Sequence, residues 1–207
     1  MDTRFSKYAA FFGRSPDFVR DPPPGAPQIS VGRFPPISAG LFRRLFTPVR
    51  DRFVYITHGM SATPMRVPAE VARLYPAKIE LIAYCREAYI GAQDGQDMVS
   101  ACLQALAVVP FEMDIFFGPM HTAAMEESFG PNPEMTAFFF AVPDGVEMRR
   151  LCSCTPAAEL IVSVMPITSS ERAYAVERGP EPLLDLFVTQ RVPNFFDPFR
   201  KSVVQSG

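Results

Sequence analysis

The residues best suited to chemistry lie in one short segment, FVYITHGMSATPM, at residues 53–65. It begins with the aromatic and β-branched residues that are typical of a strand. It then changes into a polar turn that contains His58, Gly59 and Ser61. A polar turn with a glycine at the end of a buried strand can carry chemistry, or it can serve only to turn the chain.

The residue types and their spacing do not indicate a metal site or a cofactor site. The chain has two histidines, His58 and His121. A two-histidine site would need both of them together with Glu80 or Asp114, and that spacing matches no known ligand motif. Neither a GxGxxG nor a GxxxxGK[ST] phosphate loop is present. We therefore expect no metal and no organic cofactor.

Candidate nucleophiles are present, but their surroundings are not those of a catalytic set. A Cys85–His121–Asp114 triad can be written down, yet no local pattern supports it. Ser61 lies in GMS, which is not the GxSxG elbow. The two cysteines in residues 152–154 have no second pair nearby and are interpreted as small, semi-buried residues. We expect a protein that is not an enzyme, with an orphan hydrolase using Cys85 or Ser61 as the remaining catalytic alternative.

Charge and hydropathy restrict the partners. The 207 residues include 20 basic and 22 acidic side chains, so the formal net charge of −2 provides no field for nucleic acid. No apolar run approaches the ~20 residues that span a bilayer, which predicts no membrane partner. The N-terminal residues lack the apolar run of a secretory signal, and the four cysteines favour a reduced, cytoplasmic protein.

The elements that must position these residues alternate along the chain. Residues 1–28 are predicted to be an N-terminal arm, with a short helix at about 3–12 and a proline-rich linker at 21–28; the domain itself is assigned to 29–207. We expect strands at 46–49 and 53–56, flanking a turn at 50–52, and further strands at 78–85, 114–118, 136–142 and 159–167. The strand at 78–85 is apolar on both faces and is predicted to be an inner strand.

Helices are predicted at 97–109, 168–179 and 180–189. Pro110 is expected to end the first of them, because the residue before a proline avoids the α conformation. Thr168 and Glu171 form a capping box that opens the second, and the tail at 190–207 is predicted to be irregular. The fold class is therefore α/β (α+β), a single domain with a central mixed, largely antiparallel sheet flanked by helices.

Several segments, taken in order, resemble the suppressor of fused (SUFU) family. They are YITHGMSATPM at 55–65, IELIAYCRE at 79–87, GPMHT at 118–122, the stretch 160–187 and DPFRKSVV at 197–204. The match spans about residues 29–204. The chain resembles the bacterial single-domain form of the family. One departure is the Pro119–Met120 insertion before His121. The resemblance favours a fold role for the turn: Gly59 takes a positive φ, Met60 anchors in the core and Ser61 caps the turn.

The resemblance implies a non-enzymatic protein-binding domain. Animal members bind and restrain a transcription factor, and one-domain bacterial forms are associated with polymorphic toxin systems as immunity proteins. The expected partner is therefore a toxin domain encoded nearby, bound by strand addition at a sheet edge and by an apolar cleft. An adaptor or scaffold that binds an extended peptide outside any toxin system is the alternative. The candidate partner-binding residues are Thr57, Gly59, Ser61, Glu80, His121 and Glu171.

Overall fold

The computed structural model describes residues 3–36, 52–86, 95–125, 128, 132–143, 145–155 and 157–204. The side chains of 95–97 and 145–149 are outside this description. The strand expected at 46–49 and most of the turn after it also lie outside the described residues.

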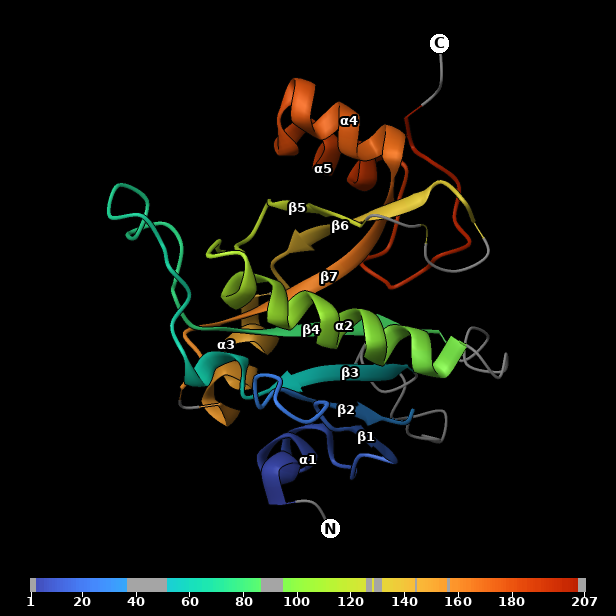
Figure 1. Cartoon of the computed structure of the whole chain (residues 1–207). Coiled ribbons are helices and arrows are strands. Elements are labelled where there is room, and N and C mark those ends of the chain that lie inside the picture. The colour runs from blue at the N-terminus through green and yellow to red at the C-terminus, as the bar shows by residue number, and fades with distance from the viewer. Residues whose placement is uncertain are drawn as a thin grey trace.

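A single seven-stranded sheet forms the centre of the fold (Figure 1). Its strands, in spatial order, are β1 (Phe18–Arg20), β2 (Ser30–Phe34), β3 (Phe53–His58), β4 (Ile79–Cys85), β7 (Leu160–Thr168), β6 (Met135–Ala141) and β5 (Thr122–Ala124). Only the β4–β7 pair is parallel. The mixed, largely antiparallel sheet is thus confirmed. The central place of β4, which is buried at every position, follows from its apolar residues on both faces.

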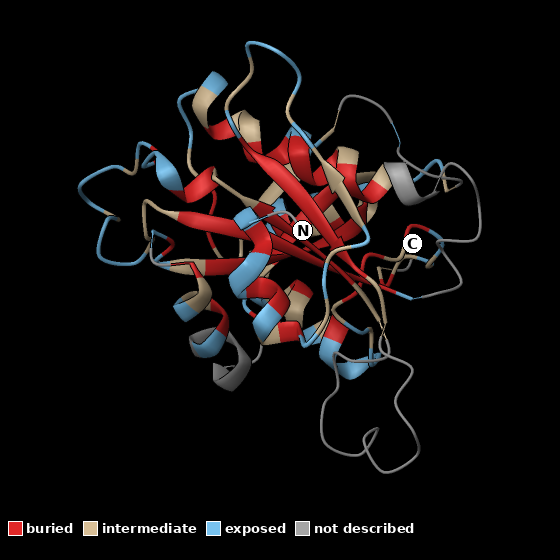
Figure 2. Ribbon diagram, turned by 90° about the horizontal axis from the view of Figure 1, so that it is seen from below, coloured by how far each residue is buried: buried red, intermediate tan, exposed pale blue. Residues whose placement is uncertain are grey.

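Helices cover both faces of the sheet, and the side chains of each strand alternate between them. Helix α2 (Gly95–Glu112) lies across one face (Figure 1), over a core that includes Val162 and Val164 of β7. On the other face, α1 (Ser6–Phe12) and α3 (Gly145–Cys154) pack against β2–β4. Helices α4 (Ser169–Arg178) and α5 (Pro180–Thr189) pack against β6 and β7 there, on Met165 and Ile167. Buried residues therefore fill the sheet and the inner sides of the helices (Figure 2).

Two segments adopt structures that differ from the sequence prediction. Helix α2 does not end at Pro110 but continues to Glu112, and the Met113 N–H still bonds to the Val109 carbonyl at 2.9 Å. Pro110 has no N–H and so removes one helical hydrogen bond, the one to the Leu106 carbonyl, but the apolar face of α2 packs on the sheet and keeps this segment helical. The expected strand at 114–118 is a turn and loop in which Asp114 has φ 54°.

The reason for the second error is that aromatic side chains in 114–118 anchor a loop instead of a strand. Phe117 is buried and stacks on Phe140 with ring centroids 4.6 Å apart. The edge strand β5 begins only at Thr122 and contains two alanines, which have low strand propensity; it forms because β6 provides its partner. Residues 152–154, which contain the two neighbouring cysteines, belong to α3, a helix that was not predicted from the sequence.

The N-terminal segment packs on the sheet through aromatic side chains. Phe5, Tyr8 and Phe12 are buried on the same face as α3, and β1 extends the sheet by one strand. Gly32 makes room for this packing, since a Cβ there would lie 2.6 Å from the Phe5 ring. Residues 21–28 contain no helix or strand. No helix in the described part of the chain is both long and apolar enough to cross a membrane.

Candidate functional site

Glu80 is the centre of a buried hydrogen-bond network at the end of β3. Its side chain is 0% exposed. Its Oε2 accepts from Thr57 Oγ1 at 2.5 Å, and its Oε1 accepts from Ser61 Oγ at 2.7 Å. The backbone N–H groups of Gly59 and Ser61 also donate to Oε1, at 3.0 and 3.1 Å. Four of the six residues expected to bind a partner, Thr57, Gly59, Ser61 and Glu80, are therefore in contact with one another.

The network replaces strand pairing where β3 and β4 separate. Paired residues extend as far as Ile56 and Ile82. Beyond them the Leu81 N–H donates to the Thr57 hydroxyl at 2.8 Å, and the carboxylate of Glu80 accepts hydrogen bonds from the N–H groups of the turn. Since a buried polar group needs a partner, these bonds allow β3 to end inside the molecule. The donors to the carboxylate all come from the end of β3 and the turn that follows it, which is the arrangement of a structural support.

The turn itself has the geometry that the family resemblance implied. Gly59 has φ 104°, in the left-handed region. Met60 begins the short helical turn η2 (Met60–Ala62) and is buried in the core beneath α2. A Cβ at Gly59 would lie 2.4 Å from the Gln28 carbonyl oxygen, so both the φ angle and the close approach of the backbone require glycine.

Replacing Gly59 by alanine is expected to lower the free energy of unfolding by more than the same change at Gly25. Both glycines have positive φ, but a Cβ at Gly25 meets no atom within 4 Å. Gly25→Ala therefore measures the backbone strain alone, about 1–3 kcal/mol. Gly59→Ala adds the collision with Gln28. Urea unfolding of both variants measures the difference, and equal losses would show that the close approach at Gly59 is relieved at no cost.

A pocket of about 340 Å³ opens beside the Glu80 network, against the N-terminal segment and the end of α3. His58 lines it, with its ring against Phe5 and Tyr8 and its Nδ1 buried without a hydrogen-bond partner among the described residues. Tyr8 donates to or accepts from Thr155 Oγ1 at 2.7 Å. Burial, with the Glu80 charge nearby, raises the pKa of Tyr8 well above its usual value, so this phenol stays neutral.

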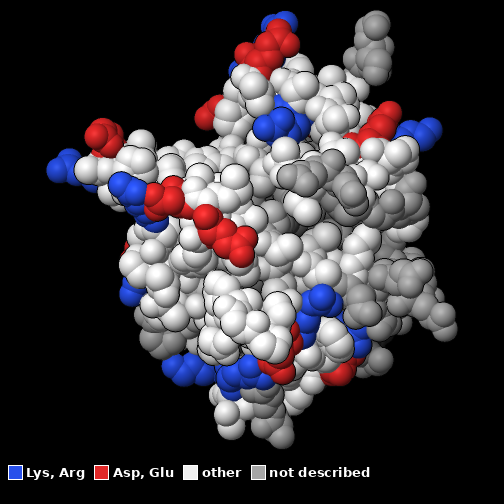
Figure 3. Space-filling model, viewed as in Figure 1, with Lys and Arg blue, Asp and Glu red and all other residues white. Residues whose placement is uncertain are grey.

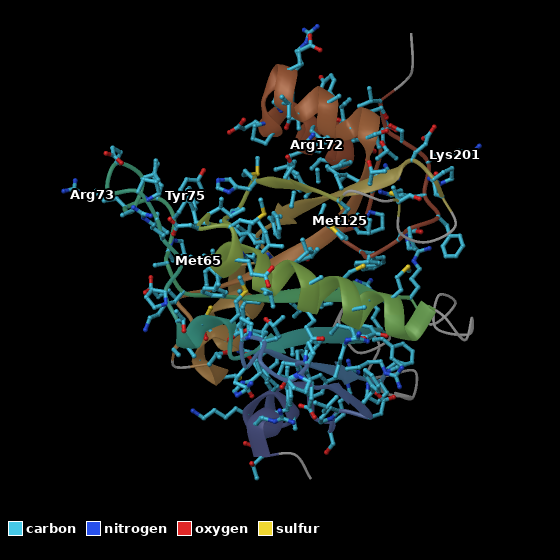
Figure 4. The ribbon with its side chains drawn as sticks, viewed as in Figure 1. Met65, Arg73, Tyr75, Met125, Arg172 and Lys201 are labelled. Atoms are coloured by element: carbon cyan, nitrogen blue, oxygen red, sulfur yellow. The ribbon has the colours of Figure 1, made fainter. Side chains whose placement is uncertain are left out.

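His121 lies elsewhere, directly before β5. Its ring packs against Tyr75 and Phe116, with centroids 4.7 and 5.0 Å away. Burial lowers the pKa of His121, which favours the neutral imidazole. Tyr75 comes from the loop between η2 and β4, whose base is closed by the Met65 N–H bonded to the Ala77 carbonyl at 2.8 Å. Figure 4 shows Arg73 and Tyr75 on this loop, which projects beyond the end of the sheet.

Glu171 lies apart from the Glu80 network and from His121. Its buried side chain forms hydrogen bonds within the molecule. It closes the predicted capping box: Glu171 Oε2 accepts from the Thr168 N–H at 2.8 Å, and Thr168 Oγ1 accepts from the Glu171 N–H. Its carboxylate also accepts hydrogen bonds from both terminal nitrogens of Arg200, each at 2.6 Å, and from the Val203 N–H at 2.9 Å. The capping glutamate thus fastens the C-terminal tail to α4, a role that the sequence did not indicate.

The four residues considered for the hydrolase alternative lie in different surroundings. Cys85 is fully buried, with its Sγ 4.0 Å from the Phe196 carbonyl, and burial raises its pKa far above the normal value for a thiol. His121 packs on Tyr75 and Phe116, and exposed Asp114 forms an ion pair with Arg66. Ser61 donates to Glu80 instead of to a histidine. Among the described residues, no group of three His, Cys, Asp or Glu side chains is arranged to hold a metal.

Comparison with known proteins places this geometry in a family. A family model described as suppressor of fused protein (SUFU) matches residues 41–201. The chain belongs to the suppressor of fused family. The match contains the Glu80 network, His121, Glu171 and Arg200, so these contacts are built from residues within the SUFU region.

Solved SUFU structures share the fold at low sequence identity. The crystal structure of a SUFU homolog from Neisseria gonorrhoeae has a TM-score of 0.61 at 16% identity, covering 99% of this chain and 97% of that chain. A structure described as the Sufu-Fu complex has a TM-score of 0.59 at 12% identity, covering 95% and 89%. A comparison with curated protein sequences finds no match. The likeness to both structures supports the single-domain α/β fold.

The sequence did not indicate that β5 is the last strand of the sheet, nor that apolar residues near it are exposed. Leu74, Met113 and Ile115 are exposed, and the Arg66–Asp114 ion pair joins the two segments that carry them. Ile115 precedes Phe116, whose ring packs on Tyr75, so these side chains belong to one surface. Met113 and Ile115 alternate with period two at the start of the segment predicted to be a strand, so the sequence carried no signal that they would be exposed.

Proposed function

We propose that this chain is an immunity protein that masks a toxin domain encoded nearby, and that it binds by strand addition at the outer edge of β5. The observation that carries this proposal is the position of β5 as the last strand of the sheet. A terminal strand presents backbone donors and acceptors that a partner strand can pair with. Membership of a protein-binding family and the complex named for one structural neighbour support binding in general.

The pairing pattern shows which groups of β5 face outward. The Phe140 N–H donates to the His121 carbonyl, and the Met125 N–H donates to the Thr136 carbonyl. Because hydrogen-bonding residues alternate along an antiparallel strand, Ala123 faces β6 as well, whereas Thr122 and Ala124 direct their N–H and C=O groups outward. Thr122 and Ala124 are thus the residues offered to a partner strand.

Apolar side chains next to the edge give a partner more to bury. His121 joins β5 to the projecting loop through its packing on Tyr75, and the loop carries Leu74, which is 75% exposed. Met113 is similarly exposed. Stable masking requires an interface of roughly 1,200–2,000 Å² in total, so the loop and the turn around Gly59 are included in the proposed surface. Figure 3 shows charges of both signs scattered over the viewed face, so specificity would come from local charge placement.

The experiment is co-expression of the chain with the neighbouring toxin domain, followed by co-purification and a growth assay. Ala124→Pro removes one outward N–H while the pairing to β6 is kept, because proline is tolerated at an edge position that faces solvent. We expect it to abolish both co-purification and protection. Ala124→Ser retains the N–H and is expected to behave as the wild type.

The outcomes separate the alternatives. If the wild-type pair neither co-purifies nor restores growth, the immunity function is wrong and the adaptor function gains support. Circular dichroism checks that Ala124→Pro is folded. If it then protects as well as Ala124→Ser, the toxin is bound elsewhere and the β5 edge is not the binding site.

A further inference from the structure

A second surface lies on the sheet face opposite α2, between α5 and the chain that follows it. There a groove of about 440 Å³ is lined by residues of α5, β6, β7 and the segment 192–195. Its floor consists of Phe139, Met165 and Phe187, all buried. The volume lies within the roughly 300–1,000 Å³ of pockets that bind small ligands. Neither the Glu80 network nor the β5 edge contributes to this groove.

Exposed apolar side chains form the rim of the groove. Val188 on α5 is 69% exposed and Val142 after β6 is 51% exposed. Leu184, one turn before Val188, lines the same wall. Covering such side chains releases apolar surface from water, so the rim favours an occupant that extends beyond the floor.

Two guanidinium groups lie at one end of the groove. Phe195 lines that end, and the guanidinium carbons of Arg52 and Arg86 lie 3.9 and 5.4 Å from its ring centroid. Arg86 is exposed. The carboxylate of Asp197, which follows in the chain, accepts from the Phe199 N–H at 3.0 Å. The exposed guanidinium of Arg86 favours an occupant that brings a carboxylate.

Asn194 adds a hydrogen-bond donor to the groove wall. Its Oδ1 accepts from the buried Ser163 Oγ at 2.9 Å, which orients the side-chain amide. The Nδ2 group has no acceptor among the described residues and is available to a backbone carbonyl. An apolar floor, an amide donor and a cationic end together match a peptide better than a fatty acid, which has no carbonyl along its chain.

We propose that this groove binds a short acidic peptide segment of the partner protein. A Leu or Phe side chain of the segment would fill the floor, a backbone carbonyl would accept from Asn194, and an adjacent Asp or Glu would pair with Arg86. The proposal rests on the protein-binding function proposed above and adds a second contact surface to it. Its peptide chemistry is defined independently of whether the partner is a toxin.

The test is selection from a displayed library of random dodecapeptides against the whole chain, followed by fluorescence polarisation with the enriched peptides. We expect enriched peptides to carry Asp or Glu beside Leu or Phe. Val188→Asp should weaken their binding at least about tenfold, because it places a carboxylate at the apolar rim. Arg86→Glu should weaken it similarly. The matched control is Val176→Asp on α4, where the valine is 70% exposed and does not line the groove.

Several results would overturn the proposal. They are the absence of enriched peptides, enrichment of basic peptides, or equal binding to Val188→Asp and Val176→Asp. Loss of peptide binding in Ala124→Pro alone would place the peptides at the β5 edge. A dimer, detected by light scattering, that Val188→Asp dissociates would make a second copy of the chain the occupant. Toxin binding that survives Val188→Asp but not Ala124→Pro would leave the immunity function standing and reject the groove.

Discussion

Glu80→Ala is expected to lower the free energy of unfolding by about 3–5 kcal/mol. The change removes the acceptor of the Thr57 hydroxyl, the Ser61 hydroxyl and the N–H groups of Gly59 and Ser61. A buried donor left without a partner costs about 1–3 kcal/mol. The neighbouring pocket lets water reach part of the turn, which keeps the loss below the sum of the separate terms. Urea unfolding with a fixed m-value measures it.

Glu80→Gln is the matched control, because its amide oxygen can still accept from the turn. We expect it to lose only about 1–2 kcal/mol, chiefly through weaker, uncharged hydrogen bonds. Equal losses for the two variants would mean that the turn finds other acceptors. A loss below about 1 kcal/mol for Glu80→Ala, the typical net value of one hydrogen bond, would contradict a supporting role for the carboxylate.

Arg200→Met is expected to cost about 3–5 kcal/mol and to release the C-terminal tail from α4. It leaves the fully buried Glu171 carboxylate without its cation and removes the donor to the Pro166 carbonyl, now at 2.8 Å. The Val203 N–H, which bonds to Glu171, should then exchange with solvent faster. Unfolding in urea measures the stability, and hydrogen exchange at Val203 reports the release of the tail.

Two controls define the role of this ion pair. Lys201→Met, at an exposed neighbour whose side chain points away from the molecule in Figure 4, should change stability by less than about 0.5 kcal/mol. The double variant Glu171→Gln/Arg200→Met should be more stable than Arg200→Met alone, because no unpaired charge stays buried. A double variant no more stable than the single one would show that the loss comes from packing instead of charge.

Much of the local structure could be predicted from residues that are close in the chain. The capping box of Thr168 and Glu171 is a hydrogen-bond exchange over three residues, so the types and spacing alone predicted where α4 begins. Apolar residues on both faces predicted that 78–85 is an inner strand, because only a strand covered on both sides needs them. The turn glycine at 59 was predicted by the resemblance, and its φ confirms it.

Elements whose structure depends on a partner far away in the chain could not be predicted from the sequence. Pro110 predicted a helix end because the residue before a proline avoids the α conformation, but α2 packs on the sheet and continues to Glu112. The segment 114–118 has strand-like residues and no strand beside it, whereas 122–124 has the partner β6 and forms β5. Propensity describes a residue and its neighbours, and it is overridden when a better-packed arrangement exists.

By itself, the sequence determined the fold class, the inner strand, the α4 and α5 helices and the residue types available at the turn, because each depends on contacts over a few positions. Only the tertiary structure decided what the candidate residues do. It brought Glu80 to a turn about 20 residues before it in the chain and Arg200 to Glu171, and it kept His121 apart from both. Such contacts depend on strand register and tail placement, which are set by burial across the whole molecule and leave no pattern in adjacent residues.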